Sequence, residues 1–129
     1  MSKLISGIHH VAMKCADMEE FEKAKDFYGR VLGLEQLREW PAGVMFDSGS
    51  GYIEIFNSGK AAASTGTINH FAFYTNDPDA CVKTVKENGY EVFVEPKNVV
   101  LASQPPLPIR VAFCRGPVGE EIEFFSERS

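Results

Sequence analysis

An internal repeat is the feature that most restricts how this chain can fold. Residues 8–17 read IHHVAMKCAD, and residues 68–77, sixty positions later, read INHFAFYTND. A second match joins residues 53–56 (IEIF) to residues 122–125 (IEFF) at a slightly larger separation. A chain of 129 residues has the length of one domain. The two matches therefore predict that this domain contains the same module twice.

Each copy of the first segment is followed by a pattern typical of an α-helix. Asp17 can cap the first helix, Glu20 stands where it can complete a capping box, and apolar residues recur at helical spacing as far as Gly33. Asp77 can cap the second helix, which has Pro78 at its first position, where an N–H would have no intrahelical partner. Both modules are therefore expected to begin with a strand and a helix.

Three strand-like runs follow each helix, which completes a βαβββ order in both halves. In chain order, the expected strands cover approximately Glu35–Trp40, Val44–Asp47, Gly51–Asn57, Glu91–Glu95, Ile109–Cys114 and Glu121–Phe125. The second copy is longer than the first, and its extra residues are expected in a connection at Lys97–Pro108. A stretch of small residues at about 59–66 is expected to link module 1, at about 1–58, to module 2, at about 67–129.

The predicted fold class is α+β. Neither copy of βαβββ can bury a sheet face alone, so the two tandem modules are expected to lie side by side. They are predicted to form a curved mixed sheet, a half-barrel cup, with the helices on its outer face.

Composition excludes several classes of function. The formal net charge of −5 and the lack of a basic run argue against nucleic-acid binding. No apolar stretch approaches the ~20 residues that a membrane span needs, and the N-terminal residues lack the apolar core of a signal peptide. Cys15, Cys81 and Cys114 form no C-x-x-C pair, so buried thiols in a reducing cytoplasm are expected instead of a disulfide framework.

Strand periodicity puts four ligand-type side chains on one face of the expected sheet. Successive side chains of a strand alternate between its faces, and His10, Glu54, His70 and Glu123 all fall on the face away from the helices. One such residue alone is usually an ordinary surface residue, but four at matched positions require four coincidences. A buried carboxylate is costly unless it is paired or binds a metal. The set predicts a site for one divalent ion, with Ni²⁺, Zn²⁺, Co²⁺, Fe²⁺ and Mn²⁺ as candidates.

His9 is the natural rival to His10 as a ligand. It has the opposite face parity, and the residue that matches it in the repeat is Asn69. His9 is therefore not counted among the predicted ligands.

The chain resembles a known superfamily in five segments that occur in a characteristic order. The segments are IHHVAMKCAD, FYGRVLGLE (27–35), GYIEIF (51–56), INHFAFYTND and GEEIEFF (119–125). Together they resemble the vicinal oxygen chelate superfamily, which includes glyoxalase I, methylmalonyl-CoA epimerase, extradiol dioxygenases and bleomycin- or fosfomycin-resistance proteins. The likeness covers essentially the whole chain. In that superfamily the metal ligands come from the first and last strands of each module. On this chain the matching positions are the four residues already selected.

The resemblance also implies an activity. A set of two His and two Glu is most similar to glyoxalase I (lactoylglutathione lyase), which implies a metal-dependent lyase or isomerase. The implied substrate is a small 2-oxoaldehyde–thiol adduct or a hydroxycarbonyl, which reacts through an enediolate. The resemblance favours Glu123 as the catalytic base, with Glu54 as the alternative.

Five further residues are expected to contact the small-molecule substrate. Face parity selects Lys14, Tyr52, Phe56, Tyr74 and Phe125. Lys14 stands where glutathione-dependent bacterial glyoxalases usually carry Arg, and Lys lacks the bidentate fork of Arg. Glutathione is therefore left open as the thiol.

Other functions remain open on the same scaffold. They are an epimerase, an extradiol dioxygenase and a non-catalytic protein that binds a small molecule such as an antibiotic. The resemblance implies a homodimer, and it leaves open whether the site forms within one chain or across two.

Overall fold

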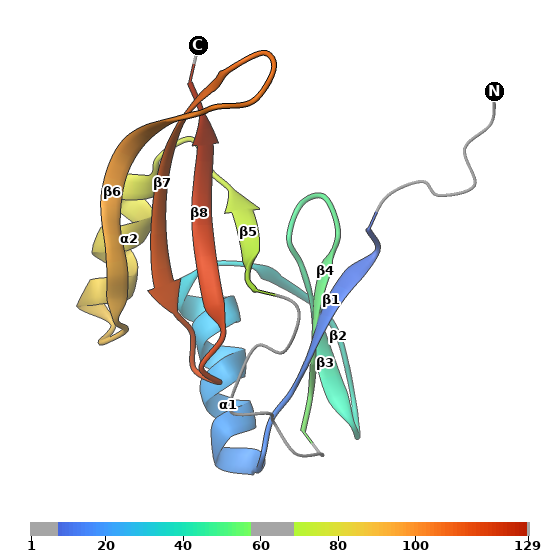
Figure 1. The fold of residues 1–129 in the computed structure, drawn as a ribbon. Helices are drawn as coiled ribbons and strands as arrows, with labels where there is room; N and C mark the ends of the chain where they lie inside the picture. The colour runs from blue at the N-terminus through green and yellow to red at the C-terminus, as the bar shows by residue number, and fades with distance from the viewer. Residues whose placement is uncertain (1–7, 58–68, 129) are drawn as a thin grey trace, which may run out of the picture. The chain divides into compact units, whose positions relative to one another are not determined.

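The computed structural model describes residues 8–57 and 69–128. The chain divides into two compact units, Met1–Ala61 and Ala62–Ser129. The described residues of each unit form one α-helix and four strands (Figure 1). The described parts of these units are called the first and the second module below. The linker expected at about 59–66 lies outside the described residues.

The first module has the predicted βαβββ order. Its elements are β1 (His10–Lys14), α1 (Met18–Asp26), a π-helical turn η1 (Phe27–Val31), β2 (Glu35–Trp40), β3 (Gly43–Asp47) and β4 (Tyr52–Phe56). The strands form one sheet in the order β1-β4-β3-β2. Strand β1 runs parallel to β4, and the other neighbours are antiparallel.

The second module repeats this topology. Its elements are β5 (Phe71–Tyr74), α2 (Pro78–Glu87), β6 (Val92–Leu101), β7 (Leu107–Arg115) and β8 (Glu121–Glu127). The sheet order is β5-β8-β7-β6, with β5 parallel to β8 and antiparallel pairs elsewhere. The prediction of an α+β fold with two tandem βαβββ modules is confirmed.

Helix α1 begins at the predicted cap. The Asp17 carboxylate accepts a hydrogen bond from the Glu20 N–H at 2.8 Å. The Glu20 carboxylate in turn accepts from the Ala16 N–H at 3.0 Å, one residue before the position of a standard capping box. At the other end, the chain leaves η1 through Gly33, whose φ of +76° is accessible to glycine without strain.

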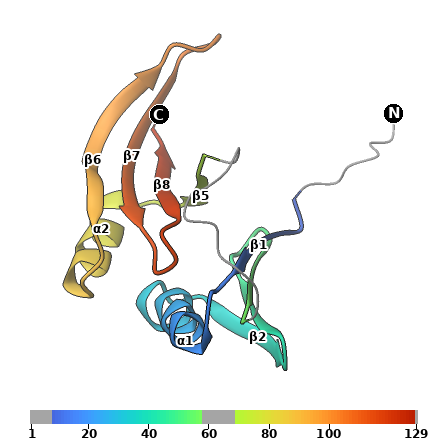
Figure 2. The same cartoon turned by 60° about the horizontal axis from the view of Figure 1, so that its bottom comes forward.

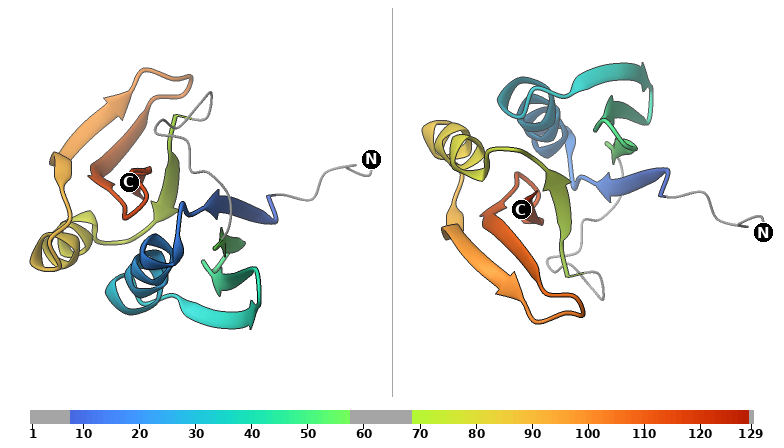
Figure 3. Two further views of the ribbon diagram at one scale, coloured as in Figure 1. Left: turned by 90° about the horizontal axis from the view of Figure 1, so that it is seen from below. Right: turned by 90° about the horizontal axis from the view of Figure 1, so that it is seen from above.

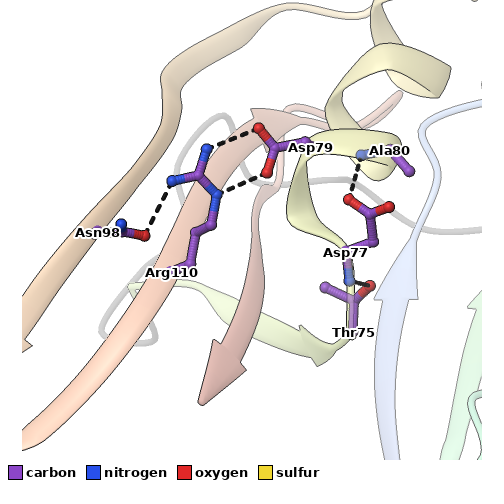
Figure 4. Close-up of polar contacts among 6 residues, drawn as sticks. All are labelled: Thr75, Asp77, Asp79, Ala80, Asn98 and Arg110. Carbon is purple, nitrogen blue, oxygen red and sulfur yellow. Dashed lines mark hydrogen bonds and ion pairs between the residues drawn. The ribbon is translucent and has the colours of Figure 1, made fainter. Parts of the chain in front are cut away.

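Helix α2 is held to its sheet by a cluster of polar side chains. Arg110 on β7 donates to both carboxylate oxygens of Asp79, in the first turn of α2, at 2.7 and 2.8 Å (Figure 4). Its guanidinium also donates to Asn98 on β6 at 3.0 Å. Asp77 caps the same helix by accepting from the Ala80 N–H at 3.0 Å. Seen end on in Figure 3, α2 lies beside the sheet to which it is connected.

Contacts of the helices identify the inner face of each sheet. The Tyr28 hydroxyl, from η1, reaches the Met13 sulfur on β1 at 3.6 Å. In the second module the Cys81 thiol on α2 lies 3.5 Å from the Thr75 hydroxyl, just after β5. The last strands bury the residues of the same parity, namely Ile53, Ile55, Ile122 and Phe124. These contacts confirm which face of each strand packs on the helix.

The extra residues of the second module lie at Lys97–Pro108, as expected, but most of them belong to strands and not to a connection. Strands β6 and β7 continue through most of this range as a long hairpin, and only residues 102–106 lie outside the two strands (Figures 1 and 2). The register of this pair shifts between Val94 and Lys97, which places Pro96 at an irregularity where no ladder hydrogen bond is needed. Beyond it, Val99 pairs with Ile109, because apolar and β-branched residues extend the ladder.

Two of the three cysteines behave as small apolar residues. Cys15 and Cys114 are buried, as expected, whereas Cys81 is half-buried. Burial raises the pKa of the Cys114 thiol to about 12, so this group is not a thiolate at neutral pH. No helix in the described part of the chain is both long enough and apolar enough to span a membrane.

Candidate functional site

The first module brings one predicted histidine and one predicted glutamate together. Strands β1 and β4 lie in parallel register with Ala12 opposite Glu54, and His10 lies two residues before Ala12 on the same face. The His10 Nε2 and Glu54 Oε1 atoms are 3.5 Å apart. The imidazole is 41% exposed and the carboxylate only 15%. The pair is therefore accessible to solvent from the sheet face opposite the helix.

The second module builds the same pair in the same way. Ala72 on β5 lies opposite Glu123 on β8, and His70 lies two residues before Ala72. The His70 Nε2 and Glu123 Oε1 atoms are 3.0 Å apart. The two side chains are 33% and 11% exposed. The repeat in the sequence is thus also a repeat of the His–Glu contact.

Glu123 has an unusual environment for a carboxyl group. Among residues 8–57 and 69–128 it is the only polar or charged residue that is buried. Loss of solvent raises the pKa of its carboxyl, and the hydrogen bond and charge of His70 act in the opposite direction without cancelling the rise. A buried carboxyl of this kind calls for a proton or a cation beside it.

Each pair supplies two ligands of the kinds that transition-metal sites use. An imidazole nitrogen and a carboxylate oxygen are ligands that Zn²⁺ and its neighbours accept. Within either described module, no group of three or more His, Cys, Asp or Glu side chains could hold a metal ion. Protein metal sites of this class use at least three protein ligands. The donor types fit the predicted ion, and neither pair alone supplies three protein ligands.

Three of the expected substrate contacts lie in the first module. Tyr52 and Phe56 are on β4, with the parity of the His–Glu pair. The Tyr52 ring lies against His9 at 4.8 Å between centroids, and the Phe56 ring meets Trp40 edge to face at 6.2 Å. Lys14 lies opposite Phe56 in the register and is exposed. This face combines aromatic surface with the cation of Lys14.

The other two expected substrate contacts lie in the second module. Tyr74 and Phe125 are opposite each other in the β5–β8 register. Tyr74 is 72% exposed, and its hydroxyl donates to the Glu127 carboxylate at 2.5 Å. That hydrogen bond raises the pKa of the Tyr74 phenol. Tyr74 therefore has a polar partner from its own module, whereas Phe125 offers apolar surface alone.

The structure adds apolar neighbours that sequence reasoning missed. Phe113 on β7 lies opposite Glu123 in the register, and its ring meets the His70 ring edge to face at 5.2 Å. Met45 on β3 lies opposite Glu54 in the first module. Face parity within the expected strands contained this signal, but it becomes specific only when the antiparallel register is known.

Two polar neighbours of the histidines were also missed. The Nδ1 atom of His9 lies 3.0 Å from Nδ1 of His10. The Oδ1 atom of Asn69 lies 2.6 Å from Nδ1 of His70. Both residues precede a predicted ligand directly, and parity had excluded His9 as a ligand without assigning it another role.

Comparison with known sequences identifies relatives along nearly the whole chain. The family model of the Glyoxalase/Bleomycin resistance protein/Dioxygenase superfamily matches residues 7–124. The uncharacterized protein YwkD of Bacillus subtilis (strain 168) is 31% identical over 100 residues, which are 68% of this chain and 76% of YwkD. The match to the family model confirms the resemblance drawn from the repeated segments.

Comparison with solved structures gives the same fold. A Bacillus anthracis protein described as a glyoxalase family member is 25% identical, with a TM-score of 0.73 over 99% of this chain and 100% of its own. A glyoxalase/dioxygenase from Nostoc punctiforme is 20% identical, with a TM-score of 0.72 over 100% and 99%. Lactoylglutathione lyase from Agrobacterium tumefaciens is 21% identical, with a TM-score of 0.66 over 95% and 94%. At such identities the last two comparisons show the fold alone.

Proposed function

Because the chain belongs to the glyoxalase/bleomycin resistance protein/dioxygenase superfamily, we propose that it is a metal-dependent lyase or isomerase of the glyoxalase I type. The supporting observation is the His–Glu pair that occurs at equivalent positions in both modules. His10, Glu54, His70 and Glu123 together would hold one divalent ion, of which Ni²⁺, Zn²⁺, Co²⁺, Fe²⁺ and Mn²⁺ are the candidates. The proposed substrate is a small 2-oxoaldehyde–thiol adduct or a hydroxycarbonyl.

The proposed reaction moves a proton between adjacent carbons of the substrate. The bound ion supplies Lewis-acid stabilisation of charge on neighbouring substrate oxygens. Glu123 is the proposed base, because burial raises the pKa of its carboxyl. A carboxylate with a raised pKa takes up a proton more readily and can then return it. Glu54, which occupies the equivalent place in the other module, is the alternative.

The remaining residues of these faces are proposed to bind the substrate. Tyr52, Phe56 and Phe125 offer aromatic surface to its apolar part. The exposed ammonium of Lys14 would pair with an anionic group. We also propose that the protein is a homodimer in the cytoplasm; light scattering that gives the mass of a single chain would contradict the dimer.

Metal content is the first test of the proposal. The protein is dialysed against each candidate ion, then against buffer, and bound metal is measured by elemental analysis. We expect about one ion per chain in the wild type, and loss of that ion in His10→Ala and in Glu123→Gln. Glu87→Gln, which changes an exposed carboxylate on α2, is the control and should bind like the wild type. A wild-type protein that retains none of the five ions would refute the site.

Activity is the second part of the same test. The loaded protein is assayed with methylglyoxal and a panel of thiols, and product formation is followed spectroscopically. Turnover that disappears in Glu123→Gln supports the lyase or isomerase. Oxygen consumption with a catechol and Fe²⁺ would instead identify a dioxygenase, and ligand binding that a chelator does not change would identify a non-catalytic binding protein.

A further inference from the structure

The two candidate ligand histidines are contacted in the same way by different residues. His9 and Asn69 match each other in the repeat, and each directly precedes a candidate ligand. The Nδ1 atom of His10 is 3.0 Å from Nδ1 of His9. The Nδ1 atom of His70 is 2.6 Å from Oδ1 of Asn69. In both rings the contacted atom is the nitrogen that does not face the glutamate.

We propose that His9 and Asn69 are positioning residues that hold Nδ1 of His10 and His70, so that Nε2 of each ring faces its glutamate. As far as metal binding is concerned, this inference rests on the proposed function. The ring orientation itself does not, because it concerns contacts within each module.

The contact at Asn69 determines which nitrogen of His70 carries the hydrogen. A carboxamide oxygen can only accept a hydrogen bond, so Nδ1 of His70 must donate. In the neutral ring, Nε2 then has a lone pair and no hydrogen. This lone pair lies 3.0 Å from Oε1 of Glu123, which is also an acceptor when ionised. Two acceptors at this distance need a proton or a cation between or beside them, and a bound metal ion can supply the cation.

Contacts with the start of β4 hold His9 in place. The His9 carbonyl oxygen accepts from the Tyr52 N–H at 2.9 Å. The His9 ring lies against the Tyr52 ring, with centroids 4.8 Å apart. A Cβ atom at Gly51 would come within 3.1 Å of the same carbonyl oxygen, so the backbone approach is close. These contacts hold the His9 ring, whose Nδ1 meets Nδ1 of His10. Because His9 matches Asn69 in the repeat, Nδ1 of His9 is assigned the role of acceptor that Oδ1 of Asn69 has.

The repeat itself supplies matched control variants. His9→Asn and Asn69→Asp each place an oxygen acceptor at the position, whereas His9→Leu and Asn69→Leu remove the native acceptor. Both native side chains are exposed, so none of these changes opens a cavity in the core. Thermal unfolding of every variant verifies that the fold is retained.

Two measurements test the inference. Nitrogen-15 NMR of the imidazole rings, with a chelator present, reports which nitrogen carries the hydrogen in His10 and His70. Zinc affinity by competition with a chromophoric chelator reports the consequence for binding. We expect Asn69→Leu to mix the two tautomers of His70 and to weaken zinc binding by about 10–100-fold. His9→Leu should act in the same way on His10, while His9→Asn and Asn69→Asp should resemble the wild type.

The outcomes separate this inference from the proposed function. If the wild type binds zinc and the Leu variants keep both its affinity and its tautomers, the positioning role is refuted and the proposed function stands. If the wild type binds no metal but the Leu variants still change the tautomers, the positioning role is supported and the proposed function fails.

Discussion

At the scale of single residues, Glu123 lies in an environment that opposes the ionisation of its carboxyl. Its carboxyl is buried beside His70, in register with the apolar Phe113. A buried carboxyl without a compensating cation destabilises the folded state in its charged form. Such a residue is typical of a site that trades stability for function.

We expect Glu123→Gln to be more stable than the wild type when a chelator is present. Burial raises the pKa of this carboxyl in the folded protein above its ordinary value of 4.5. The folded and unfolded states are both protonated below that value, and the folded protein loses stability as the pH rises from that value toward the raised pKa. Glutamine is neutral throughout and carries an amide that can donate to Nε2 of His70.

The measurement is the melting temperature of both proteins in buffers from acid to neutral pH, with a chelator. The higher melting temperature expected for Glu123→Gln should be absent in acid, and the difference from the wild type should grow as the pH rises. Glu87→Gln, on the exposed surface of α2, should show no such trend. A constant difference across the range would mean that burial does not penalise the charge of Glu123.

At the scale of elements, each sheet has two faces with separate tasks. The face toward the helix carries the packing contacts, such as Tyr28 with Met13, and the ion pair of Arg110 with Asp79. The opposite face carries the His–Glu pair. Because side chains alternate along a strand, a substitution on one face need not disturb the other.

Asp79→Asn and Arg110→Lys should therefore lower stability without affecting the metal. Each removes the bidentate contact that joins α2 to β7. Both groups are partly solvated, so the loss in melting temperature should be modest. Calorimetric unfolding and metal analysis of the two variants check this, and a loss of bound metal in Asp79→Asn would contradict the separation of the faces.

At the scale of the whole molecule, the two modules are built alike and each offers two of the four proposed ligands. One ion held by both pairs would make metal binding depend equally on both modules. Two ions, each held by a single pair, would instead be weak and independent, because two protein ligands leave most of the coordination sphere to water.

The thermal shift on metal loading distinguishes these arrangements. A ligand at about 100 times its dissociation constant stabilises the folded state by about 2.7 kcal/mol. We expect this shift in the wild type and its loss in both His10→Ala and His70→Ala. Differential scanning fluorimetry with and without metal measures it. If each variant kept half of the stoichiometry and part of the shift, the pairs would be separate sites.

The sequence alone was sufficient for the features that depend on local pattern. The duplication of βαβββ, the caps at Asp17 and Asp77, and the face on which each candidate ligand lies all follow from spacing within a few residues. These predictions succeed because capping and alternation are properties of the backbone geometry of one element.

The tertiary structure decided what depends on the pairing of strands. The register that joins His70 to Glu123 and sets Phe113 beside them links residues far apart in the chain. The continuation of β6 past Pro96 depends on a shift in the ladder with β7, which no spacing within β6 reveals. The contact of Asn69 with His70 depends on how the two side chains turn. Local pattern could not predict these features, because hydrogen bonds between strands and contacts between rings are made across space.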